Sequence, residues 1–525
     1  MLLPPGRPLL VDDEAHTVDG AAGGAPGRRR RPPVPWIATG ALLCLIAGVR
    51  VAVQLRWGEV TGLDTGNWFT FGHAWLGQPL PGGAASTYPP LVPVVVALLG
   101  RVFDPLIVMA IVGGVATLVH GGCAAVVLWR SGCGWWTVPL ATALAAGSAA
   151  GEAVAWGGQP QLLALGVALL VLHLMAELLV APRRRVALEL GAAGLLLGAT
   201  SHLVLAETVI AGVAVLLLRL LAPLPRPSAG GARRALGLWC LAAAPSLLLL
   251  PLYARLATTV GGSFAERQHA QSFVDFVAAV GAVSRELPLL WRPVIVFALL
   301  VPLVLWRERT RPLWLVTAAL AVTLGAVALV SPEPRFAYLV PLLVVAALGL
   351  VVTTSPLTGL GKLRVVVALA GAAACTASAA SGLALFPDQI RYYGTLVPAG
   401  TTEALAAMRA STATDDVVAV PPVRGLPFGW WVEGYGERAA LVGSSSQWLN
   451  FPQERKRAEI SVALFSSADV LSDRWLRQAR ALGVDVVYLP ASYDGLPAGA
   501  LERLHRDHPR LIIRSDSAAT IVELP

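Results

Sequence analysis

The sequence is poor in charged residues, which make up only 14% of its 525 residues, whereas 56% are hydrophobic. A soluble enzyme of this length carries more polar surface, so the composition excludes an ordinary globular protein. The mean hydropathy is +0.66. The apolar residues fall in runs of about 20, which is enough to cross about 30 Å of hydrocarbon. The sequence therefore predicts an α-helical polytopic membrane protein.

Cysteines are also scarce, and the motifs of many soluble enzymes are missing. The five cysteines lie in or beside apolar segments without paired spacing, which indicates neither a disulfide framework nor a metal site. The sequence has no Walker A motif, no G-x-G-x-x-G and no G-x-S-x-G. The 40 basic residues exceed the 32 acidic ones, but they cluster between apolar runs. This pattern is typical of membrane topology and argues against nucleic-acid binding.

The basic loops give a topology for about eleven transmembrane helices. The predicted spans are residues 35–55, 105–129, 135–150, 160–181, 186–200, 203–222, 235–254, 288–306, 312–330, 335–354 and 364–386. Alternate loops are rich in Lys and Arg, and the positive-inside rule places these loops and the N-terminus in the cytoplasm. Arg50 falls inside the first span, near its outer end, where we expect its side chain to snorkel to the interface.

This topology divides the chain into three parts. Residues 1–34, rich in Pro, Gly and charge, predict a disordered cytoplasmic tail. Residues 35–387 form the transmembrane domain, with a first outer loop at 56–104. From 388 to 525 the apolar runs shorten, and strands are predicted near 415–420, 439–442, 484–489, 511–513 and 519–524, with helices at 402–409 and 469–482. These residues predict a small extracytoplasmic α/β domain.

The first outer loop carries the most informative residue, Asp64. An aromatic helix follows it, from Thr65, with a face suited to the headgroup plane. Next come Tyr88 and the sequence Pro-Pro-Leu, at the start of an apolar segment that is too short to cross the membrane and is predicted to be interfacial or re-entrant. The order is span, acid, aromatic helix, Tyr-Pro-Pro-Leu, apolar helix, span.

This order resembles the GT-C superfamily of membrane glycosyltransferases, which use polyprenyl-phosphate-linked sugars. The resemblance implies that Asp64 is a general base, that Glu152 assists it and that Tyr88 contacts the substrate. Two motifs depart from the family pattern. No second acid stands beside Asp64, which weakens a metal role, and the absence of a Trp-Trp-Asp motif argues against an oligosaccharyltransferase. An alternative role for Asp64 is to cap the helix that begins at Thr65.

Several further residues are candidates, each with a structural alternative. Glu152 is the only acid of the second outer loop and is otherwise an exposed loop residue. Trp156 is a sugar-stacking platform or an interfacial anchor. His202 contacts substrate or closes a helix hairpin through a hydrogen bond. Trp430, Trp431, Tyr435 and Trp448 of the last part bind carbohydrate or pack in its core.

Cationic residues of the outer loops are candidates for the donor phosphate. Arg267 and His269 lie in the third outer loop, and a guanidinium binds phosphate bidentately. Arg335 is the lone base of its loop, at the start of a span, where a cation stabilises a departing phosphate. The alternative for Arg335 is a pair with Glu333 or snorkelling.

These residues favour an inverting hexosyl- or pentosyltransferase of the plasma membrane, with a polyprenyl-phosphate sugar as donor and a glycan or lipid-linked acceptor in the cell envelope. The sequence indicates no certain cofactor, and it leaves open whether the protein uses a divalent metal, Mg²⁺ or Mn²⁺. The Ala-, Arg- and Gly-rich composition resembles that of high-GC bacteria such as actinobacteria. Two alternatives remain: a transporter or flippase for a lipid-linked glycan, and a catalytically inactive scaffold.

Overall fold

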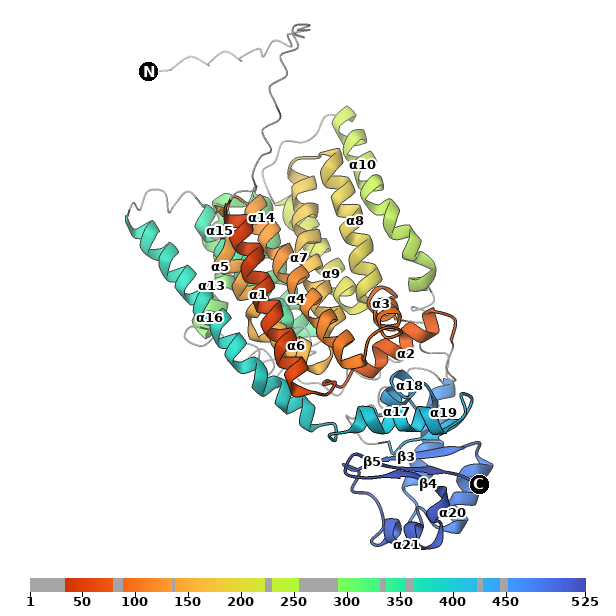
Figure 1. The fold of residues 1–525 in the computed structure, drawn as a ribbon. Helices are drawn as coiled ribbons and strands as arrows, with labels where there is room; N and C mark the ends of the chain where they lie inside the picture. Colours follow the sequence, from red (N-terminus) through yellow and green to blue (C-terminus); the bar gives the residue numbers. More distant parts are fainter. Residues whose placement is uncertain are drawn as a thin grey trace, which may run out of the picture.

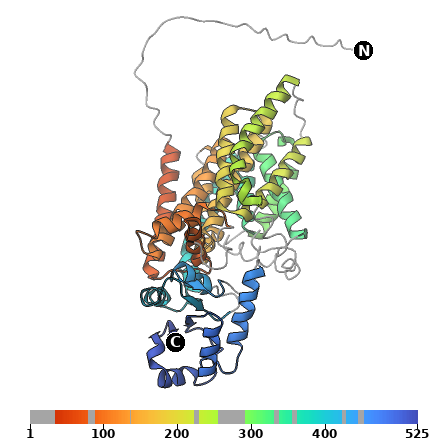
Figure 2. The ribbon, with the colours of Figure 1, turned by 90° about the vertical axis from the view of Figure 1, so that its right-hand side faces the viewer.

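The computed structural model describes residues 34–78, 88–134, 137–221, 229–254, 291–330, 337–354, 362–422, 428–443 and 452–525. A helical bundle is followed by a smaller unit built around a sheet, which lies at the end of the bundle opposite the start of the first helix (Figure 1). Figure 2 shows the same two parts after a quarter turn.

The bundle consists of helices that differ widely in length. They are α1 (Val34–Trp57), α2 (Thr65–Trp75), α3 (Leu91–Leu99), α4 (Pro105–Arg130), α5 (Thr137–Ala146), α6 (Ser148–Trp156), α7 (Gln159–Val180), α8 (Arg184–Thr200), α9 (His202–Leu220), α10 (Ala229–Ala243), α13 (Trp291–Val304), α14 (Pro312–Val330), α15 (Leu339–Thr353) and α16 (Lys362–Thr395). The short helices α2 and α3 form the predicted aromatic and apolar segments of the first outer loop.

Capping residues set the ends of some of these helices. Asp104 precedes α4, and its side chain accepts a hydrogen bond from the Leu106 amide, while Pro105 occupies the first turn. Ser201 alone separates α8 from α9, and its hydroxyl accepts from the Val204 amide. The predicted short turn at this point is therefore a single capping residue.

Six described helices are long and apolar enough to cross a membrane: Trp36–Trp57, Pro105–Arg130, Thr137–Trp156, Gln159–Val180, His202–Leu220 and Arg233–Ala254. Three shorter apolar helices are Ile295–Val304, Pro312–Ala328 and Leu339–Thr353. The prediction of a helical, multi-pass membrane protein is confirmed. The count of about eleven spans and the orientation of the termini stay predictions.

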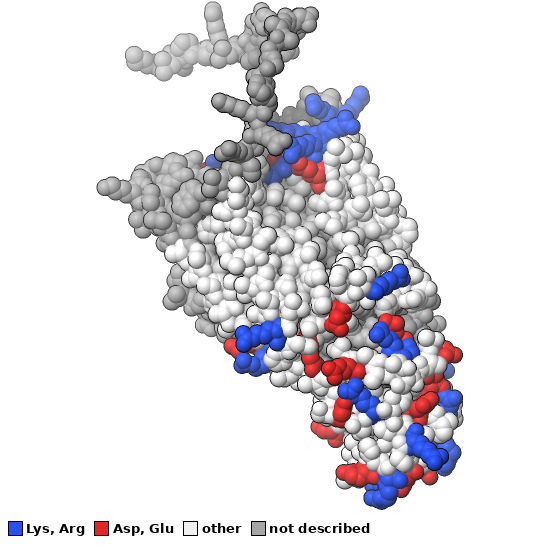
Figure 3. Space-filling view, viewed as in Figure 1, with Lys and Arg blue, Asp and Glu red and all other residues white. Residues whose placement is uncertain are grey.

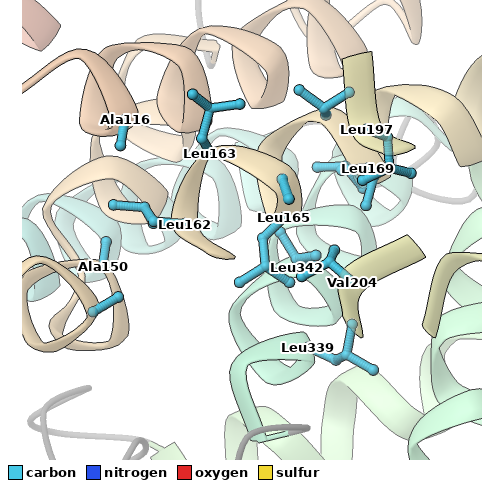
Figure 4. Close-up of a cluster of buried hydrophobic side chains, with 14 of the residues drawn as sticks. Ala116, Ala150, Leu162, Leu163, Leu165, Leu169, Leu197, Val204, Leu339 and Leu342 are labelled. Atoms are coloured by element: carbon cyan, nitrogen blue, oxygen red, sulfur yellow. The ribbon is translucent and has the colours of Figure 1, made fainter. Parts of the chain in front are cut away.

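Helix α7 forms the centre of the bundle. Leu162, Leu165 and Leu169 on this helix are buried among side chains from α4, α6, α8, α9 and α15 (Figure 4). The outward faces of the surrounding helices carry exposed Leu, Ile and Val side chains, as expected for lipid contact. Figure 3 shows Lys and Arg gathered at one end of the bundle, a wide band without charge, and mixed charges at the other end.

The structure differs from the prediction at two points within the spans. The span predicted at 135–150 corresponds to the candidate span Thr137–Trp156, which is interrupted at Gly147 between α5 and α6 and runs on beyond the predicted end. Glu152 is therefore a half-buried helical residue and not a loop acid. Arg50 does not snorkel, because its side chain is fully buried between helices. Hydropathy identifies apolar segments, but it does not show which face of a helix turns inward.

The residues after α16 form a mixed five-stranded sheet with helices. Its elements are α17 (Thr401–Ser411), β1 (Val417–Ala419), α18 (Phe428–Gly434), β2 (Ala439–Ala440), α19 (Pro452–Phe465), α20 (Asp473–Ala481), β3 (Val486–Pro490), α21 (Ala500–Asp507), β4 (Ile512–Ser515) and β5 (Ala519–Glu523). The strand order is β2-β1-β3-β5-β4. The first three strands of this order are parallel, and the remaining pairings are antiparallel.

The central strand β3 is buried along its whole length, which fits its continuous apolar sequence. Each of the five predicted strand segments overlaps one of the observed strands, although β3 and β4 end one and two residues beyond the predicted ends. The predicted helices correspond to α17 and α20. The division into three parts and the extracytoplasmic position of this unit stay predictions.

Candidate active site

Asp64 lies in the turn that leads into α2, and it is half-buried. It occupies the N-cap position with helical backbone angles (φ −96°, ψ 0°), but its side chain makes no capping hydrogen bond. Its Oδ1 instead accepts from the Asn67 side-chain amide at 3.3 Å. The alternative that the carboxylate caps α2 is therefore wrong, and the helix begins without that bond.

The Asp64 turn meets the end of α6 through backbone contacts. The Asp64 amide donates to the Trp156 carbonyl at 3.4 Å, and the Trp68 indole donates to the Gly157 carbonyl at 2.7 Å. Gly62 has φ +99°, and a Cβ there would lie 2.6 Å from the Trp156 carbonyl carbon. Only glycine combines this backbone angle with so close an approach. The fold thus places two predicted site residues, Asp64 and Trp156, side by side.

Two tyrosines, which the sequence did not single out, hold the polar groups of α6. The Tyr393 hydroxyl on α16 donates to Glu152 Oε1 at 3.1 Å. The Trp156 indole nitrogen donates to the Tyr338 hydroxyl at 3.0 Å. Tyr338 also borders a small cavity next to Gly147. Glu152 and Trp156 are one helical turn apart, so α6 presents an acid and an indole at the same end of the bundle as Asp64.

Tyr88 and His202 are also brought together. The Tyr88 ring stacks on Phe71 with centroids 5.4 Å apart and an interplanar angle of 1°. The Trp68 ring lies 4.9 Å from Tyr88 on the α2 side, and the His202 ring meets Tyr88 edge-on at 5.2 Å. This aromatic cluster (Trp68, Phe71, Tyr88 and His202) joins α2 to the start of α9.

The sheet unit packs directly on α2 through α18. A Cβ on Gly66 would lie 2.7 Å from the Trp430 carbonyl oxygen, and a Cβ on Gly434 would overlap the Gly66 carbonyl oxygen. The Trp431 indole donates to the Leu63 carbonyl at 3.4 Å, next to Asp64. This contact fixes the chain on both sides of the candidate base.

Aromatic packing completes the contact between α2 and α18. The Phe69 and Tyr435 rings lie 5.1 Å apart, and Trp431 meets Tyr435 edge-on at 5.0 Å. Trp431 and Tyr435 are both buried, so they pack in the core and do not offer a face for sugar stacking. Burial raises the pKa of the Tyr435 phenol, which keeps it neutral. Trp430 is half-buried, and Trp448 lies outside the described residues.

The remaining candidates lie outside the part of the chain that the structure describes. These are the predicted phosphate-binding residues Arg267, His269 and Arg335. Within the described ranges, no three His, Cys, Asp or Glu side chains are grouped as metal ligands. The predicted Mg²⁺ or Mn²⁺ site therefore stays a prediction.

No family model matches the sequence, and no curated protein matches it. Solved structures do share its fold. ArnT from Cupriavidus metallidurans, solved bound to undecaprenyl phosphate, is 14% identical, with a TM-score of 0.55 over 94% of this chain and 99% of that chain. The mycobacterial arabinofuranosyltransferase AftD, solved as a mutant, is 16% identical, with a TM-score of 0.51 over 92% of this chain. The match covers 41% of AftD. At the level of the fold, the chain therefore agrees with ArnT and with part of AftD.

Proposed function

We propose that the protein is a membrane glycosyltransferase that moves a sugar from a polyprenyl-phosphate donor to an acceptor in the cell envelope. The position of Asp64 carries the proposal. Its carboxylate lies at the start of α2 without serving as a helix cap, and its backbone adjoins the end of α6, which bears Glu152 and Trp156. The fold adds support, since ArnT has the same fold and was solved with undecaprenyl phosphate bound.

In the proposed reaction, Asp64 acts as the general base. Its carboxylate takes the proton from an acceptor hydroxyl while the oxygen of that hydroxyl attacks the anomeric carbon of the donor sugar. The bond from the anomeric carbon to the phosphate oxygen breaks, and polyprenyl phosphate leaves with the electron pair. Attack from the face opposite the leaving group inverts the anomeric configuration. Asp64 then returns its proton to water.

The neighbouring side chains have supporting roles in this proposal. Glu152, held by Tyr393, orients the acceptor hydroxyls. The aromatic cluster around Tyr88 and His202 borders the substrate site on the side of α9. The predicted cations Arg267, His269 and Arg335 would stabilise the phosphate as negative charge develops on it.

The test uses the full-length protein in lipid nanodiscs. Transfer is measured from radiolabelled polyprenyl-phosphate hexoses and pentoses, with envelope extracts as acceptors. Asp64→Asn is expected to lower the transfer rate by about 10²–10⁴-fold, the usual contribution of a general base. Asp104→Asn is the matched control, because it makes the same change in the same outer loop and an Asn still caps α4.

Equal transfer by Asp64→Asn and Asp104→Asn would refute the role of Asp64. The transporter alternative receives one observation in its favour, since broken helices are common in transporters and α5–α6 is broken at Gly147. Movement of the donor across the membrane needs a closed compartment, so this alternative is tested in proteoliposomes and not in nanodiscs. Donor movement without transfer by the wild type would favour it over the enzyme.

A further inference from the structure

The break between α5 and α6 is held from two sides. Gly147 has extended backbone angles (φ −56°, ψ 156°) between two helical segments. On one side, α16 approaches so closely that a Cβ on Gly382 would overlap the Ala146 carbonyl oxygen. On the other side, the Arg50 side chain reaches the Gly147 carbonyl from α1. The break is therefore a packed joint and not a loose hinge.

The Arg50 guanidinium connects four elements. Its Nη1 donates to the Thr117 hydroxyl on α4 at 3.0 Å, and its Nη2 donates to the Gly147 carbonyl at 3.4 Å. The guanidinium lies over the Phe386 ring of α16, 5.5 Å from the centroid. The side chain is 0% exposed. No carboxylate among the described residues forms an ion pair with it.

Burial of a charge in this way has a large desolvation cost in free energy. A fully buried guanidinium without an anionic partner costs more than a packed apolar side chain of similar volume. Arg50 lies seven residues before the end of α1 at Trp57, so it is about 10 Å inside the helix end. At Gly147 the charge lies between the C-terminal end of α5, whose dipole favours a cation, and the N-terminal end of α6, whose dipole opposes one. The interactions that the structure gains from this residue are the hydrogen bonds to Thr117 and to the Gly147 carbonyl and the contact over the Phe386 ring.

The joint determines where α6 points. Helix α6 starts directly after Gly147, and Glu152 and Trp156 follow within its nine residues. Tyr393 holds Glu152, and the Trp156 carbonyl accepts from the Asp64 amide. A small rotation of α6 at Gly147 would thus move both groups relative to Asp64.

We infer that Arg50 is a positioning residue: it fixes the Gly147 joint and, through α6, sets the positions of Glu152 and Trp156 relative to Asp64. This inference rests on the proposed function for its catalytic consequence, but the structural part stands apart from it. Arg50 acts through the joint and touches no reacting atom.

The test compares Arg50→Met, Arg50→Lys and Arg56→Met in full-length protein in nanodiscs. Arg56 is the control, because it lies on the same helix with an exposed side chain. Hydrogen exchange, followed by mass spectrometry, should become severalfold faster in the peptide 143–157 of Arg50→Met, with little change in α4 and α7. Donor KM should stay within about twofold, while kcat should fall by up to about 100-fold, as for a reacting group misplaced by about 1 Å.

Arg50→Lys should recover part of both effects, because an ammonium still donates to the Gly147 carbonyl but lacks the planar fork. Unchanged exchange in 143–157 would overturn the inference. Equal acceleration in all helices of both Arg50 variants would also overturn it, because Arg50 would then stabilise the whole bundle. If wild type transfers no sugar, the proposed function fails, while the exchange data still decide the role of Arg50 at the joint.

Discussion

The contact between α18 and α2 allows a quantitative prediction for Gly434→Ala. The added methyl would overlap the Gly66 carbonyl oxygen and lie 3.0 Å from the Gly66 carbonyl carbon. These neighbours are helix backbone, so a side-chain rotation does not relieve the overlap. Overpacking of this kind costs about 1–3 kcal/mol. Gly434 has no positive φ, so the backbone itself accepts alanine.

We expect the added methyl to destabilise the docking of α18 on α2 and not the folding of the bundle or of the sheet unit. The sheet unit has a core of its own, which includes Trp475 and Leu476 on α20, away from α2. A penalty of 1–3 kcal/mol lowers the ratio of docked to undocked forms by about 5- to 150-fold. In the undocked form, the Trp431 bond to the Leu63 carbonyl is lost, so the chain beside Asp64 is less well held.

Limited proteolysis measures this ratio directly. Cleavage tracks the population of the opened form when opening and closing are fast relative to cleavage. We therefore expect cleavage near α18 to accelerate by a factor in the range above, together with slower sugar transfer. Gly237→Ala on α10 is the control, because no atom lies within 4 Å of the added methyl. The reasoning is refuted if the two variants are cleaved and transfer sugar at the same rates.

Two further predictions concern Tyr393 and Asp516. Tyr393→Phe removes the hydrogen bond to Glu152, and transfer should fall by about 10- to 150-fold, since bonds to charged groups contribute about 1.5–3 kcal/mol. The exposed Tyr392→Phe should leave transfer unchanged. The backbone amide of Ala518 lowers the pKa of Asp516, so this carboxylate stabilises the fold above its unfolded pKa of about 3.9 and loses that effect as pH falls through its folded pKa. Melting curves in nanodiscs at decreasing pH should show a smaller loss for Asp516→Asn than for wild type.

The sequence predicted the elements better than their contacts. Hydropathy and strand periodicity identified most helices and all five described strands, because burial in lipid or in a sheet leaves a regular pattern. Asp64 and Trp156 were candidates for separate reasons, and only the fold showed that their backbones touch. Tyr338 and Tyr393 were missed, because a single tyrosine near a helix end has no pattern of its own.

The errors have a common physical cause. Arg50 was expected to reach the interface, since charge in a span is costly, but its Nη1 and Nη2 find acceptors within the bundle. The break at Gly147 was hidden because a glycine among alanines does not lower hydropathy. Both features depend on neighbours from distant parts of the chain, Thr117 on α4 and Gly382 on α16.

Helix α16 runs along the bundle and fixes the spacing between several contacts. Its 34 residues span about 51 Å, well beyond the roughly 30 Å of hydrocarbon. Gly382 meets the joint, Tyr393 meets Glu152, and Gly394 packs against Trp57 at the end of α1. One residue inserted between Gly382 and Tyr393 would rotate the later contacts by about 100° and shift them by about 1.5 Å. Changes of length between Gly382 and Gly394 should therefore not be tolerated.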